Sequence, residues 1–128
     1  MRWLPLALIC LSLAACGDEA TSAGPAGATK LMVRVDGDGS GPTKERTLEL
    51  SCAKSDQSEA CAAASKLTAS DLAPTPANTA CTQIYGGPET ASIKGTLNGE
   101  PVDDKFARND GCEIKRWDAA APLLDEVR

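Results

Sequence analysis

The chain has 128 residues, a formal net charge of −5 and no basic cluster, which argues against nucleic acid or an anionic membrane surface as a partner. It contains no histidine, so Ser-His-Asp catalysis, Cys-His catalysis and every His-ligated metal site are excluded. Hydrophobic residues make up 42% of the chain but aromatic residues only 3%, which predicts one domain with a thin core that needs covalent staples.

The N-terminus has the pattern of a processing signal. Met1–Trp3 carries one positive charge, and the apolar run Leu4–Ala14 is shorter than the roughly 20 residues that span a bilayer. The sequence Leu13-Ala14-Ala15-Cys16 resembles the lipobox of bacterial lipoproteins, in which the signal is cut before the cysteine and the cysteine sulfur is lipidated. The alternative is an ordinary secretory signal. We expect residues 1–15 to be the signal peptide and Cys16 to anchor an extracytoplasmic protein to a bacterial membrane.

A predicted tether is followed by two predicted strands. Residues 16–29 are small and polar without periodicity, which is typical of a flexible tether, so the folded domain is expected over residues 30–128. Lys30–Val35 and Arg46–Cys52 alternate apolar and polar side chains, which predicts two half-buried strands joined by the loop Asp36–Glu45.

An alanine-rich helix is expected after the second strand. The sequence Asp56-Gln57-Ser58-Glu59 resembles a capping box with Asp in place of Ser or Thr, and the helix would continue to about Leu67. Its apolar face would point Cys61 inward toward a strand. The residues on that face are Ala60, Cys61, Ala64 and Leu67.

A hairpin is predicted in the second half of the chain. Ala91–Leu97 and Glu100–Ala107 read as strands, and Asn98-Gly99 between them is the strongest short hairpin signal. Gly111–Trp117 is compatible with a short helix or with a last edge strand. The elements together predict an α+β domain with a single antiparallel sheet of about five strands, one main helix and a short second helix. Asp103-Asp104 would lie on opposite faces of a strand, so they make no acid–base pair and no enzyme is expected.

Four cysteines remain in the expected domain. An even number in an exported, aromatic-poor domain predicts two disulfides, and the sequence leaves all three connectivities open. A zinc site is the competing interpretation, but the spacings contain no C-x2-C pair, so we expect no metal and no cofactor. The cysteines concerned are Cys52, Cys61, Cys81 and Cys112.

The segment Asp71–Glu89 is long, contains several prolines and has no regular pattern, and such loops are either disordered or functional. If Cys81 pairs with Cys112, the disulfide pins the middle of the loop and residues 82–85 project as an extended ridge. Extended backbone is what a protease cleft accepts as an added β-strand, and a rigid loop binds with little ordering cost. The alternative is that Ile84 and Tyr85 fold back onto the core.

The motifs LELSCA at Cys52, the alanine-rich helix with Cys61 and CTQIY at Cys81 resemble the subtilisin inhibitor-like family of secreted actinobacterial proteins. The resemblance covers roughly Leu31 to Trp117 and rests on the order of the four cysteines, with C-x-x-hydrophobic-Y at the third. It implies a five-stranded antiparallel sheet with helices on one face, and a homodimer formed through the sheet in many members. It also implies the disulfides Cys52–Cys61 and Cys81–Cys112.

The resemblance further implies a reactive bond, Gln83–Ile84, with Gln83 as the primary specificity residue and Thr82 and Tyr85 in flanking subsites. The expected partner is a subtilisin-like serine endopeptidase, because Gln83 lacks the positive charge that trypsin requires. The expected function is a membrane-anchored, extracytoplasmic inhibitor of serine proteases. The alternative is a non-inhibitory lipoprotein that uses the fold as a surface binding or scaffolding module, which is motivated by the flexibility that Gly86-Gly87 adds.

Overall fold

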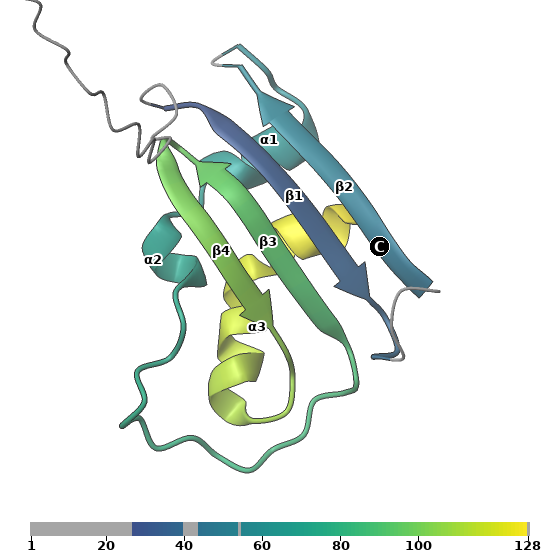
Figure 1. Cartoon of the computed structure of the whole chain (residues 1–128), viewed down its shortest axis with the longest axis vertical. Coiled ribbons are helices and arrows are strands. Elements are labelled where there is room, and N and C mark those ends of the chain that lie inside the picture. The colour runs from purple at the N-terminus through teal and green to yellow at the C-terminus, as the bar shows by residue number, and fades with distance from the viewer. Residues whose placement is uncertain (1–26, 40–43, 54, 128) are drawn as a thin grey trace, which may run out of the picture.

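Four strands form one antiparallel sheet in the order β2-β1-β3-β4 (Figure 1). The computed structural model describes residues 27–39, 44–53 and 55–127. The α+β class and the single antiparallel sheet are confirmed, but the expectation of about five strands is wrong for the described residues, which form four. The strands are β1 (Thr29–Asp36), β2 (Glu45–Cys52), β3 (Thr90–Leu97) and β4 (Glu100–Phe106).

The main helix lies where the sequence left helix and strand open. It is α3 (Gly111–Leu124), followed by the 3-10 turn η2 (Asp125–Val127), and it takes the place of the expected fifth strand. Asp110 begins it, because its carboxylate accepts a hydrogen bond of 2.9 Å from the Glu113 N–H. Apolar side chains then recur at helical spacing and are buried: Trp117, Ala120, Leu123 and Leu124.

The helices cover only one face of the sheet, and the core lies between the two layers (Figure 1). Alternate strand residues such as Val33, Ile93 and Phe106 point into this core and are almost fully buried. The opposite face carries exposed ion pairs, for example Lys94 with Asp103 at 3.1 Å. The sheet is therefore amphipathic, as the alternation in β1 and β2 predicts.

The expected alanine-rich helix forms as α1 (Glu59–Ser65), but its cap differs from the prediction. The N-cap is Ser58, whose hydroxyl accepts from the Cys61 N–H at 3.3 Å, and Asp56 instead accepts from the Ser58 N–H at 2.9 Å. The shorter hydroxyl side chain lies one residue before the helix, so it reaches the free N–H groups of the first turn. The helix also ends at Ser65, before the expected boundary at Leu67.

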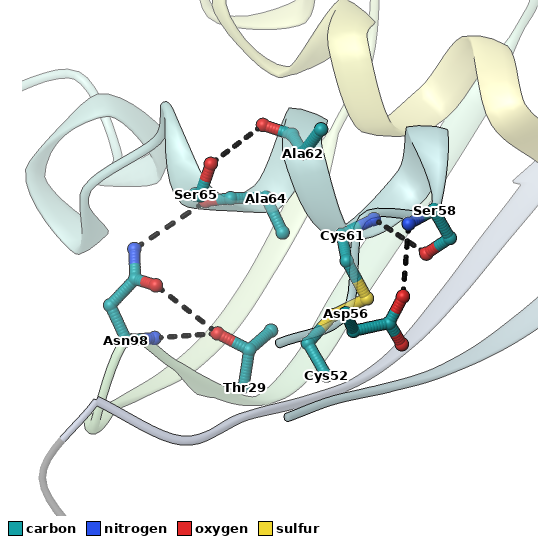
Figure 2. The surroundings of a disulfide bond; sticks show 9 residues. All are labelled: Thr29, Cys52, Asp56, Ser58, Cys61, Ala62, Ala64, Ser65 and Asn98. Carbon is teal, nitrogen blue, oxygen red and sulfur yellow. Dashed lines mark hydrogen bonds between the residues drawn. A yellow bond between two sulfur atoms is a disulfide. The ribbon is translucent and has the colours of Figure 1, made fainter. Parts of the chain in front are cut away.

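The turn between β3 and β4 contacts the C-terminal end of α1 (Figure 2). Asn98 and Gly99 have φ angles of 51° and 90°, as a type I′ turn requires. The Asn98 side-chain amide donates to the Leu67 carbonyl at 2.9 Å and to the Ala64 carbonyl at 3.4 Å. Its backbone N–H donates to the Thr29 hydroxyl at 3.0 Å. One residue thus closes the hairpin and caps the carbonyls at the end of α1.

Three expectations concern residues that the structure does not describe, wholly or for the most part. The signal peptide (residues 1–15) and the lipidated Cys16 lie outside the described ranges, as does most of the tether over residues 16–29. In the part of the chain that is described, no helix is long and apolar enough to cross a membrane.

Candidate functional site

The loop between α2 (Ala69–Leu72) and β3 runs without helix or strand. In Figure 1 it passes around the end of the molecule at which β4 ends and α3 begins. Ile84 is 59% exposed and Tyr85 is 67% exposed, and they are the exposed large hydrophobic residues of the described ranges. They do not fold back onto the core, which was the alternative left open by the sequence. Two neighbouring apolar side chains exposed on a loop make this segment the candidate site of the described residues.

The N-terminal side of this exposed stretch is fixed to the first turn of α3. Cys81 forms a disulfide with Cys112, and the Thr82 carbonyl accepts a hydrogen bond of 2.9 Å from the Gly111 N–H. Because Gly111 is the first residue of α3, its N–H has no acceptor within the helix and is available to the loop. A side chain at Gly111 would collide with the Thr82 hydroxyl, so glycine allows the close approach.

The C-terminal side is fixed to the segment between β4 and α3. The Gly86 N–H donates to the Arg108 carbonyl at 2.7 Å. A Cβ atom at Gly86 would lie 2.9 Å from the side chain of Ile114, so a larger residue there would make that side chain shift. Gly87 has a φ of +141°, a region that only glycine adopts readily. Backbone geometry therefore favours glycine at position 87, and close packing against Ile114 favours a small residue at position 86.

An ion pair supports the same side of the loop. Arg108 Nη1 lies 3.3 Å from Glu89 Oε1, and the two side chains are only 27% and 25% exposed. The Arg108 guanidinium also lies 5.8 Å from the centroid of the Trp117 ring, within the range of a cation–π contact. Motif analysis did not find this pair, because its members are separated by 19 residues and belong to no regular element.

Gln83, Ile84 and Tyr85 thus stand between two backbone hydrogen bonds and beside a disulfide. Within the described ranges, these three residues make no backbone hydrogen bond through their own N–H or C=O groups. Their backbone groups are therefore available to an approaching chain, as they are in a peptide that adds to the edge of a sheet. The expected site residues Thr82, Gln83, Ile84 and Tyr85 lie together at this one place.

The loop begins at a second anchor, Arg116, which is almost buried and which sequence analysis missed. Its guanidinium donates to the carbonyls of Leu72 and Ala73 at 2.9 Å each, and to the Glu113 carboxylate at 2.8 Å. It also lies 4.8 Å over the Phe106 ring. These contacts fasten the end of α2 and the first loop residue to α3, so the loop starts from a fixed point.

The acidic pair of β4 does not form an acid–base site. Asp103 pairs with Lys94 on the open face of the sheet, whereas Asp104 lies 3.9 Å from Arg116 on the helical side. Burial raises the pKa of Asp104, although the Arg116 charge acts in the opposite direction. The two carboxylates therefore point to different faces, as their adjacent positions in a strand predict.

Two findings bear on a metal site. The sulfur atoms of Cys81 and Cys112 and the carboxylate of Asp110 lie within 4.8 Å of one another. The two sulfurs are joined in a disulfide, so they are not the thiolates that bind metals. Cys52 and Cys61 form the second disulfide. The four cysteines of the described residues are thus paired in the combination that the family resemblance implies.

Comparisons of the chain with protein-family models, with curated proteins and with solved structures give no match. The function is therefore inferred from the geometry of the loop and from the residues that carry the family resemblance.

Proposed function

We propose that the protein is an inhibitor of serine endopeptidases that presents residues Thr82–Tyr85 to the protease as a substrate-like loop. The scissile bond is Gln83–Ile84, and the target class is the subtilisin-like proteases. The protein acts by binding and not by turnover. The lipid on Cys16 holds it on the outer side of a bacterial membrane, where secreted proteases are met.

The observation that carries the proposal is the exposure of Ile84 and Tyr85 on a segment that is fixed on both sides. Full burial of such a side chain stabilises a complex by about 1.5–3 kcal/mol. A loop that is already held in place loses little conformational freedom on binding, so more of this energy appears as affinity. The anchors are the Cys81–Cys112 disulfide and the two backbone hydrogen bonds of Thr82 and Gly86.

The same anchors explain why a protease gains little from cutting the loop. Residue Gln83 follows Thr82, which is bound to α3, and Ile84 is two residues from Gly86, which is bound to Arg108. After a cut between Gln83 and Ile84, both new ends stay tethered beside each other. Resealing then competes with release, because the two ends are held at a high effective concentration.

Specificity follows from Gln83, which has a neutral side chain of medium length. Trypsin-like enzymes need a cation to meet the buried acid of their primary pocket, so they are poor partners for this loop. A broad primary pocket, as in subtilisin-like enzymes, accepts the glutamine together with the apolar Ile84 and Tyr85 that follow.

A titration of several purified serine proteases with the mature protein tests the proposal. We expect stoichiometric loss of activity for subtilisin-like enzymes and weak or no inhibition of trypsin. Rapid digestion of the protein without inhibition of any enzyme would contradict the proposal and would favour a non-inhibitory binding or scaffolding module.

A further inference from the structure

We propose that Arg108 is a positioning residue of the loop, which holds the Ile84 side of the Gln83–Ile84 bond in place. This inference rests on the proposed inhibitory function, but the effect of Arg108 on the loop is tested in the free protein, where no protease is needed. The residue supports the loop twice, once through its backbone carbonyl and once through its side chain.

The backbone contact lies directly beside the exposed ridge. The Arg108 carbonyl accepts the Gly86 N–H at 2.7 Å, and Gly86 follows Tyr85 in the chain. The Cβ atom of Arg108 would lie 3.2 Å from a Cβ added at Gly86, so the two backbones are in close contact. This hydrogen bond sets where Ile84 and Tyr85 leave the body of the protein.

The side chain extends the support toward β3. Trp117, which is 3% exposed, lies beneath the Arg108 guanidinium, and the guanidinium contacts Glu89 at 3.3 Å. The contacts therefore run from the core of α3 through Arg108 to the residue that precedes β3. Residues 86–89 are held at both of their ends by this one arginine.

The geometry of the Arg108–Glu89 ion pair indicates that it positions residues 86–89 more than it raises the free energy of unfolding of the protein. It is joined by one nitrogen and one oxygen, while Glu89 Oε2 and Arg108 Nε are buried without a hydrogen-bond partner among the described residues. A partly buried pair of this kind adds little net stability, because desolvation offsets the attraction between the charges. Removing Arg108 leaves the partly buried Glu89 carboxylate without its cation, so residues 86–89 are expected to move and expose that carboxylate to water.

The short segment from Arg108 to Cys112 then holds both sides of the reactive bond. Gly111 and Cys112 hold Thr82 and Cys81, and Arg108 holds Gly86 and Glu89. Cutting the bond adds one water molecule, giving a carboxylate at Gln83 and an ammonium at Ile84, and resealing expels that water. The disulfide tethers the Gln83 end only, so the position of the Ile84 end depends on Arg108.

The test compares Arg108→Met with wild type and with Lys94→Met. Methionine keeps an apolar stem over Trp117 but removes the charge, and Lys94→Met removes the cation of an exposed pair on the far side of the sheet. Amide hydrogen exchange is measured by NMR at Gly86 and Gly111 in the free protein. We expect Arg108→Met to accelerate exchange at Gly86 at least fivefold, with Gly111 and the control variant unchanged.

Unchanged exchange at Gly86, or equal acceleration at Gly86 and Gly111, would overturn the inference, because the second result indicates general destabilisation. If Arg108→Met fails to fold, Glu89→Gln provides the same comparison from the other partner. With subtilisin added, we expect the equilibrium ratio of cut to intact Gln83–Ile84 bond to rise at least fivefold in Arg108→Met. If wild type does not inhibit while Gly86 exchange responds as expected, the proposed function fails and the positioning role of Arg108 stands.

Discussion

A comparison of Ile84→Ala with Ile93→Ala separates effects on protease binding from effects on the stability of the fold. Ile84 is 59% exposed and lies on the loop, whereas Ile93 is fully buried in β3. The substitution to alanine removes the same atoms at both positions, so the two variants form a matched pair. Any difference between them comes from the place of the side chain in the fold.

The structure sets the size of both effects. Burying an isoleucine side chain is worth about 1.5–3 kcal/mol, and the exposed part of Ile84, less the methyl group that alanine keeps, corresponds to about 1 kcal/mol of binding energy. Ile84→Ala should therefore weaken inhibition about fivefold and change the free energy of unfolding by less than about 0.5 kcal/mol. Ile93→Ala should cost about 2–5 kcal/mol of unfolding free energy and leave inhibition by the folded fraction unchanged.

The assays are urea denaturation for stability and progress curves with a subtilisin-like protease for the inhibition constant. Inhibition by Ile84→Ala that equals wild type within twofold would refute the reasoning that this side chain is buried in a complex. A large loss of stability in the same variant would show that Ile84 packs on its own protein.

Three further predictions concern the reactive bond, the disulfide and a buried acid. Gln83→Lys should shift inhibition toward trypsin, and unchanged selectivity in a two-enzyme assay would show that Gln83 is not the primary contact. Replacing Cys81 and Cys112 together by serine should lower the free energy of unfolding by about 3–4 kcal/mol, since the bond closes a loop with a sequence separation of 31. It should also turn the loop into a substrate, and continued stoichiometric inhibition by this double variant would contradict the role of the disulfide. The pKa of Asp104 is raised above 3.8, chiefly by burial, so the folded state binds this proton more tightly than the unfolded state. The contribution of Asp104 to stability should therefore fall as pH rises from 3.8 through the raised pKa, and Asp104→Asn should be at least as stable as wild type at pH 7, with the difference vanishing below 3.8. A clear loss of stability of Asp104→Asn in denaturation at pH 7 would show that the contact with Arg116 outweighs burial.

The strands could be predicted from the sequence almost to the residue, because each has one buried and one solvated face. Apolar and polar side chains alternate in Lys30–Val35 and in Arg46–Cys52, which directly indicates one buried and one solvated face. The structure extends each of these strands by one residue at most at either end. Asn98-Gly99 was equally informative, since few other residues adopt the positive φ angles of this turn.

The main helix could not be predicted with the same clarity. Its first turns, Gly111–Trp117, hold few apolar residues, and its last turns are rich in alanine and contain Pro122. Two features that the apolar pattern does not report stabilise the helix. They are the cap formed by Asp110 and the burial of Trp117 against the sheet. Tertiary packing thus settles a segment whose local preference is weak.

Part of the candidate site was also beyond the reach of local patterns. The exposed ridge could be anticipated, because Pro and Gly residues surround Ile84 and Tyr85 and exclude a regular element. The supports of the ridge could not, since the contact of Arg108 with Glu89 joins loop residues that no periodicity relates. Arg116 likewise binds main-chain carbonyls, and such acceptors carry no signature of residue type.

Mass spectrometry of the protein bound to a subtilisin-like protease tests the central claim most directly. The complex is formed at equal concentrations and sampled over time while residual protease activity is recorded. We predict one slow cut, between Gln83 and Ile84, with cut and intact forms persisting together while the protease stays inhibited. Rapid and complete digestion, or inhibition with cuts only outside the loop, would contradict the account.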